Sequence, residues 1–89
     1  LEGTFQDERF DKISLYDNLL YYYYVVDGEK MSTKTSLKKI NKIVYTFYDS
    51  SIPFDMLIIQ EKYIILMDSS SKNSVYFKKV FKYASFEEK

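Results

Sequence analysis

The chain has 89 residues, enough for one domain with a modest hydrophobic core. Hydrophobic residues make up 46% of it, including ten Tyr and seven Phe, which excludes a disordered chain. Thirteen basic and thirteen acidic residues give a formal net charge of zero, so the chain as a whole is not expected to attract nucleic acid or anionic lipid. Cys and His are both missing from the sequence, which removes disulfides, the commonest general base and the softest metal ligands.

The first residues are polar, with phenylalanines embedded in them. We interpret residues 1–9 as a lead-in segment, and we expect residues 4–12 to form an edge strand that is anchored to the core by Phe5 and Phe10. Residues 1–3 are typical of a cloning junction, which would make the chain a piece of a longer protein. We expect residues 1–89 to form a single small β-rich domain.

Residues 13–37 predict a three-stranded antiparallel meander. Asp27-Gly28 has the composition of a type I′ hairpin turn, because both central residues need a positive φ that Asp and Gly tolerate. Asp17-Asn18 is a second candidate turn, weaker because it lacks Gly. The two turns predict the pairs Ile13–Tyr22, Leu15–Leu20, Leu20–Thr35, Tyr22–Thr33, Tyr24–Met31 and Val26–Glu29.

Both turns independently predict the same two faces, because side chains directly opposite each other share a face. A slip of one residue at either turn would scramble this division. The predicted apolar face consists of Ile13, Leu15, Leu20, Tyr22, Tyr24, Met31 and Leu37. The opposite face carries Ser14, Tyr21, Tyr23, Lys30, Ser32 and Lys34.

The second half of the chain predicts more strands and two short helical elements. Leu37 and Ile40 are three residues apart and surrounded by lysines, which indicates one helical turn near residues 37–42. Ser85 and Glu88 have the spacing of a capping box, which predicts a C-terminal helix start near residues 85–89. The predicted strands are 43–49, 56–60, 63–68 and 74–77, and the middle two form a hairpin across residues 61–62.

The predicted fold class is therefore mainly β (α+β). We expect the antiparallel meander to form a strongly bent sheet or a β-barrel, with the two helical elements at its margins.

Three pieces of the sequence resemble a known family. They are the segment Leu37-Lys38-Lys39-Ile40-Asn41-Lys42-Ile43, the hairpin 55–68, and residues 75–81 followed by residues 85–88. In this order they resemble the small bacterial pleckstrin-homology-like (PH-like) domains, and among them the YcxB-like group. The resemblance implies a strongly bent seven-stranded sheet closed at one end by a helix. It also implies a cytoplasmic location, at the inner face of the membrane where membrane spans precede the domain. It carries over no site residue.

The sequence offers no combination of residues that supports catalysis. A hydrolase pair needs two carboxylates in a cleft with separated pKa values, whereas Asp55 and Asp68 are expected at a solvated strand end. The loop serines at positions 50–51 and 69–71 have no partner base. We therefore predict no enzymatic activity, no cofactor and no metal site.

Two groups of lysines are candidates for an anion-binding rim, because point cations suit phosphates. The alternative is that they solvate turns and blunt strand edges, which the equal number of acidic residues favours. The candidate rim consists of Lys34, Lys38, Lys39, Lys42, Lys78 and Lys79, with Lys72 and Lys82 nearby in sequence.

The run Tyr21–Tyr24 is the most unusual feature of the sequence. Alternation sends Tyr22 and Tyr24 inward and leaves Tyr21 and Tyr23 on the outer face beside Val25. Exposed apolar patches often mark interfaces, so Tyr21, Tyr23 and Val25 form the candidate interface, either under the C-terminal helix or against a partner chain. Base stacking is not expected, because nucleic acid would require a more basic surround.

The predicted function is a non-catalytic protein-interaction or regulatory module with a PH-like fold, membrane-tethered in the cytoplasm, that binds a protein partner or itself as a homo-oligomer. One alternative is a structural subunit of an extracellular or phage assembly, pilin-like or a tail component, that pairs through edge strands. A second alternative is a domain that binds anionic headgroups at a membrane surface through the two lysine groups. No nucleic-acid partner is expected.

Overall fold

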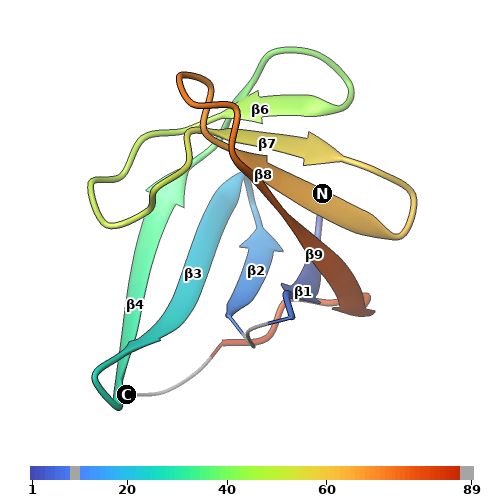
Figure 1. The fold of residues 1–89 in the computed structure, drawn as a ribbon. Coiled ribbons are helices and arrows are strands. Elements are labelled where there is room, and N and C mark those ends of the chain that lie inside the picture. The colour runs from blue at the N-terminus through green and yellow to red at the C-terminus, as the bar shows by residue number, and fades with distance from the viewer. Residues whose placement is uncertain (9–10, 87–89) are drawn as a thin grey trace.

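The computed structural model describes residues 1–8 and 11–86, and within them it forms one antiparallel sheet of nine strands. The strands are β1 (Gly3–Gln6), β2 (Lys12–Tyr16), β3 (Leu19–Val26), β4 (Glu29–Ser36), β5 (Lys38–Lys39), β6 (Val44–Thr46), β7 (Met56–Ile59), β8 (Tyr63–Met67) and β9 (Ser74–Phe81). Their order across the sheet is β4-β3-β2-β1-β9-β8-β7-β6-β5. The sheet bends into a nearly closed barrel (Figure 1), which confirms the prediction of a mainly β fold.

A single residue connects the two ends of this sheet. β4 pairs with β3 and β5 pairs with β6, yet only Leu37 separates β4 from β5 in the sequence. The Leu37 amide donates to the Asn18 carbonyl at 2.8 Å, and the leucine side chain is buried. The Thr33 hydroxyl of β4 donates to the Asp49 carboxylate at 2.8 Å, beyond the end of β6. The continuous segment formed by β4, Leu37 and β5 therefore closes the barrel. A long hydrogen-bonded ladder between the two edge strands is not needed.

The predicted meander is confirmed, including both turns and every predicted pair. Asp27 and Gly28 have φ values of 51° and 81°, and Asp17 and Asn18 have 53° and 58°. These positive values are those that a type I′ turn requires at both central positions. The two short turns therefore fix the register of three strands by local backbone geometry.

The apolar face of the meander lies inside the barrel. Ile13, Leu15 and Leu20 are fully buried, and Tyr22 is nearly so. Met31 is the exception, because it lies near the tip of the β3–β4 hairpin, which extends beyond the rest of the barrel in Figure 1. The core consists of Phe5, Ile13, Leu15, Leu20, Tyr22, Leu37, Tyr45, Phe47, Ile52, Leu57, Ile64, Leu66 and Phe77.

The helical turn predicted near residues 37–42 is wrong. The chain is extended at β5 and then reverses direction through residues 40–43. The Ile40 amide donates to the Val44 carbonyl at 2.9 Å, and the Asn41 side-chain oxygen accepts from the amides of Ile43 and Val44 at 3.0 Å each. These bonds already satisfy the backbone groups of the hairpin turn, so a helical turn would add no further hydrogen bonds.

The predicted C-terminal helix is not found in the part of the chain that the structure describes. Ser85 and Phe86 are not helical, and the Ser85 amide donates to the Ser14 hydroxyl at 3.3 Å. Residues 87–89 of this prediction lie outside the described residues. The described residues also contain no helix with the length and hydrophobicity needed to cross a bilayer.

The lead-in segment forms an interior strand, and its prediction as an edge strand is wrong. β1 pairs with β2 on one side and with β9 on the other. Phe5 on β1 is buried in the core, which confirms it as an anchor, and Phe10, the second predicted anchor, lies outside the described residues. The pairing of β1 with β9 could not be predicted, because the two strands are far apart in sequence and no local sequence pattern indicates which strands pair.

Candidate functional site

The C-terminal segment, residues 82–86, crosses the outer face of β1 and β2. The Thr4 hydroxyl donates to the Tyr83 carbonyl at 2.7 Å and lies 3.0 Å from the Ser85 hydroxyl. The Ser14 hydroxyl donates to the Ser85 carbonyl. Thr4 and Ser14 are both almost fully buried, so these bonds satisfy polar groups that water cannot reach.

An aromatic contact continues this cover over β3. The Phe86 ring meets the Tyr21 ring edge-to-face, with centroids 4.8 Å apart, and also meets the Tyr16 ring at 6.3 Å. Tyr23 is 9% exposed, and the Lys12 ammonium lies 5.0 Å from its ring centroid. Two of the three candidate interface residues, Tyr21 and Tyr23, are therefore covered by groups of the same chain.

Val25, the third candidate interface residue, remains exposed at the tip of the β3–β4 hairpin. Its exposed fraction is 62%, beside Val26 at 48% and Met31 at 40%. β4 pairs with β3 along eight residues, and among the described residues no strand pairs with its other edge. The hairpin therefore combines an unpaired strand edge with an apolar tip.

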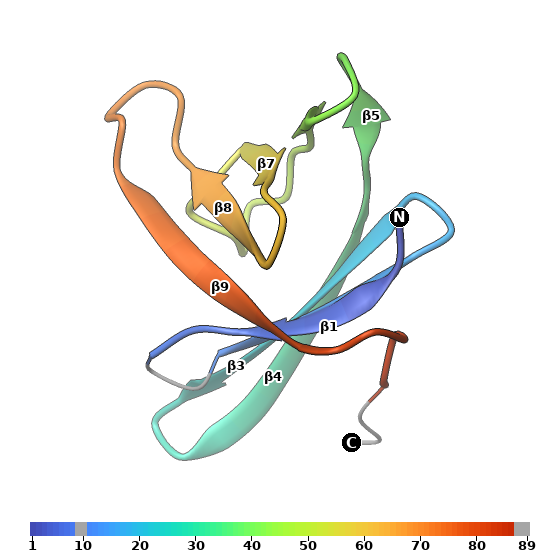
Figure 2. The ribbon, with the colours of Figure 1, turned by 90° about the vertical axis from the view of Figure 1, so that its right-hand side faces the viewer.

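The structure brings only part of the candidate lysine rim together. Lys38 and Lys39 form β5, and Lys42 lies in the turn that follows it. Lys34 lies on β4, with its ammonium 6.0 Å from the ring centroid of Tyr21. Lys78 and Lys79 are on β9, which three other strands separate from β5 in the sheet, and Figure 2 shows β9 and β5 on opposite sides of the barrel.

The two lysines of β9 have separate surroundings. The Lys79 ammonium lies 5.9 Å from the ring centroid of the buried Phe5, at one end of the barrel. Lys78 lines a surface hollow of about 510 Å³ between β8, β9 and the end of β1. These residues therefore do not extend the lysine group of β5 and its turn.

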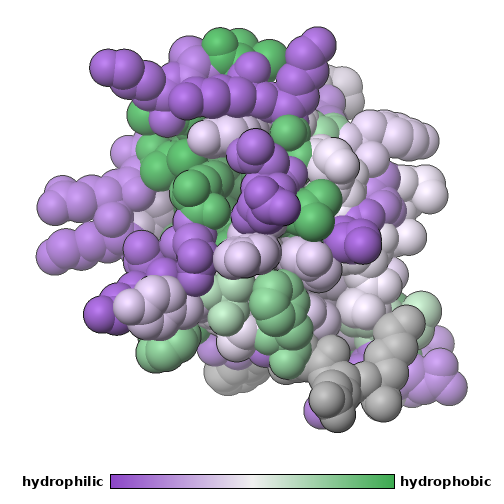
Figure 3. All heavy atoms as spheres, turned by 180° about the vertical axis from the view of Figure 1, so that it is seen from behind, coloured by the Kyte–Doolittle hydropathy of each residue, from purple (hydrophilic) through white to green (hydrophobic). Residues whose placement is uncertain are grey.

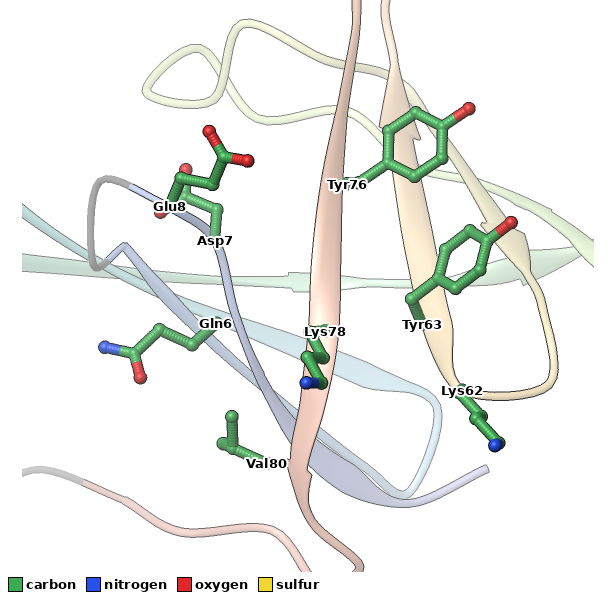
Figure 4. A pocket seen from close by; sticks show the side chains of 8 residues that line it. All are labelled: Gln6, Asp7, Glu8, Lys62, Tyr63, Tyr76, Lys78 and Val80. Carbon is green, nitrogen blue, oxygen red and sulfur yellow. The ribbon is translucent and has the colours of Figure 1, made fainter.

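The hollow beside Lys78 has an aromatic wall. The rings of Tyr63 and Tyr76 are stacked, with centroids 5.3 Å apart and an angle of 28° between their planes. Figure 4 shows the two tyrosines and Lys62 on one side of β9, with Gln6, Asp7 and Glu8 on the other side. Both charge signs border this open hollow, so its lining favours no particular ionic ligand.

The carboxylates after β6 and around the β7–β8 hairpin hold loops in place. The Ser69 hydroxyl and amide donate to Asp55 at 2.6 Å and 2.9 Å, and these bonds place the pKa of Asp55 below its ordinary value of 3.8. The hydroxyls of Ser71 and Ser70 lower the pKa of Asp68 in the same way. Asp49 has a lowered pKa because it accepts from the Ser51 amide and the Thr33 hydroxyl. All three are ionised acceptors near neutral pH, which does not suit a proton-transferring group.

The described residues contain no group of three or more carboxylates placed to hold a metal ion. Comparison with family models, with curated proteins and with solved structures gives no match. The resemblance to PH-like domains therefore stays a prediction, and function has to be argued from the surfaces described above.

Two surface features were missed in the sequence. Tyr63 and Tyr76 sit on the outer face of neighbouring strands, and only the pairing of Ile65 with Tyr76 in the β8–β9 register brings them together. Ile40 was interpreted as part of a helical turn and Ile43 as the first residue of a strand, whereas they are 55% and 49% exposed. The signal for the second feature was present in the sequence, because Lys38, Lys39 and Lys42 flank the two isoleucines and residues 38–48 contain no acidic residue.

Proposed function

We propose that this chain is a non-catalytic interaction module that associates with a second copy of itself by strand pairing along β4. The observation that carries the proposal is the unpaired edge of β4 in the part of the chain that the structure describes, at the protruding end of the β3–β4 hairpin. An exposed strand edge presents a row of backbone donors and acceptors that another strand can pair with.

The hairpin register identifies which backbone groups face outward. In a hairpin closed by a two-residue turn, the pair next to the turn is hydrogen-bonded and the pairs then alternate. Val26 pairs with Glu29, so the amides of Lys30, Ser32 and Lys34 point away from β3. These three amides are available to an added strand.

Side-chain charge selects the register of the self-paired edge. Near the hairpin tip, an antiparallel β4–β4 ladder can be centred on Ser32 or on Met31, because both registers pair outward-facing residues with each other. Centring on Ser32 places Lys30 opposite Lys34 of the second copy, and such like-charge pairs are destabilising. Centring on Met31 pairs Met31 with its own copy and places Lys30 opposite Ser32. We therefore propose a two-fold axis at Met31, with the apolar hairpin tips beside it.

The test is the concentration dependence of sedimentation for the whole chain. Ser32→Pro removes one outward amide, and Pro is tolerated at the solvent side of an edge strand. We expect wild type to form dimers as concentration rises, and Ser32→Pro to stay monomeric. Ser32→Ala is the matched control, because it keeps the amide and should dimerise as wild type does.

A second variant tests the register. Met31→Lys places two ammonium groups opposite each other across the two-fold axis, so we expect it to weaken the dimer at low salt more than at high salt. A wild-type chain that sediments as a monomer at every concentration would refute the proposal. Equal dimerisation of Ser32→Pro and Ser32→Ala would show that the association does not use the β4 edge.

A further inference from the structure

The turn between β5 and β6 carries an unusual combination of exposed side chains. Ile40 and Ile43 are about half exposed, although turns at the surface of a protein are usually polar. Lys38, Lys39 and Lys42 surround them in sequence, and all three are exposed. We call residues 38–43 the isoleucine–lysine turn.

The isoleucines are held outward by a well-bonded backbone. The Asn41 side chain accepts from two amides of the turn, and the Ile40 amide bonds to the Val44 carbonyl. The Ile59 amide bonds to the Ile43 carbonyl at 2.7 Å and ties the turn to β7. The two side chains are therefore held in exposed positions, because these hydrogen bonds fix the conformation of the hairpin backbone around them.

Charge around the turn has one sign. Between residues 38 and 48 the chain has three lysines and no Asp or Glu. The nearest acidic residue beyond β7 in sequence is Glu61, which is followed directly by Lys62. The turn thus carries a local excess of positive charge in a chain with zero net charge, and this excess acts within a Debye length of a surface.

Figure 3 shows hydrophobic side chains at the upper end of the molecule, with hydrophilic side chains projecting on both sides of them. This is the end at which the chain leaves β5 in Figure 2, and the β3–β4 hairpin tip lies at the opposite end. The isoleucine–lysine turn and the strand edge of β4 are therefore separate surfaces.

We propose that the isoleucine–lysine turn docks on an anionic lipid bilayer, with Ile40 and Ile43 inserted at the level of the headgroups and the lysines beside anionic lipids. Apolar side chains flanked by lysines are the combination that binds at a bilayer interface, where burial of apolar area and attraction to anionic lipid add together. The inference does not depend on pairing through β4. Docking by this end would leave the hairpin directed away from the membrane.

The first experiment measures flotation of the whole chain with vesicles. We expect binding to vesicles of phosphatidylcholine and phosphatidylserine at low salt, and far weaker binding to phosphatidylcholine alone. The triple variant Lys38→Gln, Lys39→Gln, Lys42→Gln should bind roughly a hundredfold more weakly, since each lysine near an anionic surface contributes about fivefold. The matched control Lys72→Gln, Lys78→Gln, Lys82→Gln removes three positive charges on and beside β9. This control should retain most of the vesicle binding.

The second experiment separates insertion from charge attraction alone. The double variant Ile40→Ser, Ile43→Ser should weaken binding about tenfold or more, whereas Val25→Ser, Val26→Ser at the hairpin tip should not. The chain has no Trp, so Ile43→Trp introduces a single reporter whose emission should shift to the blue with anionic vesicles. Failure of wild type to float, or equal binding by the double isoleucine variant, would overturn the proposal. Thermal unfolding without lipid checks that each variant is folded.

Discussion

At the scale of single residues, the carboxylates of this protein serve as hydrogen-bond acceptors for loops. Asp55 accepts from the amide and hydroxyl of Ser69, and Asp68 accepts from the hydroxyls of Ser70 and Ser71. These bonds favour the ionised form of each carboxyl, which is why both pKa values lie below 3.8. The sequence placed both residues at a strand end but gave no sign that Ser69 bonds to Asp55 across the hairpin.

The lowered pKa of Asp55 predicts a loss of stability in acid. A carboxyl whose pKa is lower in the folded than in the unfolded chain stabilises the fold above its unfolded pKa, and this contribution disappears as pH falls through the folded value. We expect Asp55→Asn to lower the melting temperature most near neutral pH and to match wild type once Asp55 is protonated. Melting curves recorded from about pH 7 down to about pH 2 measure this difference.

Ser69→Ala is the companion variant. It removes the hydroxyl that contributes most to the lowered pKa of Asp55, so its melting curves should also approach those of wild type in acid. A gap between wild type and Asp55→Asn that stays constant across the pH range would contradict the assignment.

At the scale of elements, the described C-terminal segment, residues 82–86, is not helical, whereas the capping-box pattern predicted a helix start at residue 85. Its carbonyls and the Ser85 side chain bond to Thr4 and Ser14, residues of two strands that are distant in sequence. A capping box is a local pattern, whereas these bonds to buried hydroxyls on the barrel depend on the assembled sheet. The segment also explains why Tyr21 is not left exposed.

Thr4→Val tests the role of this segment, because it keeps the shape of the side chain and removes the hydroxyl. We expect it to destabilise the fold by about 1–2 kcal/mol, since the Tyr83 carbonyl loses its partner. Urea unfolding measures the change in stability. In Thr4→Val, amide hydrogen exchange should be accelerated relative to wild type more strongly at residues 83–86 than at β3.

Ser36→Ala is the control for Thr4→Val, because Ser36 is an exposed hydroxyl on β4, and it should change stability by only a few tenths of a kcal/mol. If Thr4→Val is as stable as wild type and residues 83–86 keep their protection, the hydroxyl is not what holds the segment.

At the scale of the whole molecule, the barrel depends on the corner at Leu37. The strand changes partner there, from β3 before the corner to β6 after it. The Thr35 hydroxyl donates to the Tyr48 carbonyl at 3.0 Å and ties the corner to the segment after β6. The two halves of the sheet are therefore joined through a short stretch of chain.

Leu37→Ala should accordingly destabilise the whole barrel. We expect a loss of about 2–4 kcal/mol in the free energy of unfolding, because a buried leucine side chain is removed from the corner. Hydrogen exchange should show β4 and β6 losing protection together. Ile40→Ala, three residues further on and exposed, is the control and should leave stability nearly unchanged. Loss of protection confined to β4 would contradict the role of this corner in closure.

The meander could be predicted in full from the sequence, and the remainder of the barrel could not. Positive φ at Asp27-Gly28 and Asp17-Asn18 is a local property of those residues, and two-residue turns transmit it directly into strand register. The pairing of β1 with β9 joins residues more than seventy positions apart, and no local preference encodes it.

The sequence by itself determined the mainly β class, the two turns and which tyrosines of the meander point inward, because backbone preference and alternation act over a few residues. Only the tertiary structure decided that Leu37 closes the barrel, that the C-terminal segment covers Tyr21, and that Ile40 and Ile43 are exposed together. Each of these depends on which distant groups supply hydrogen bonds and burial, and that choice is made only when the whole sheet is assembled.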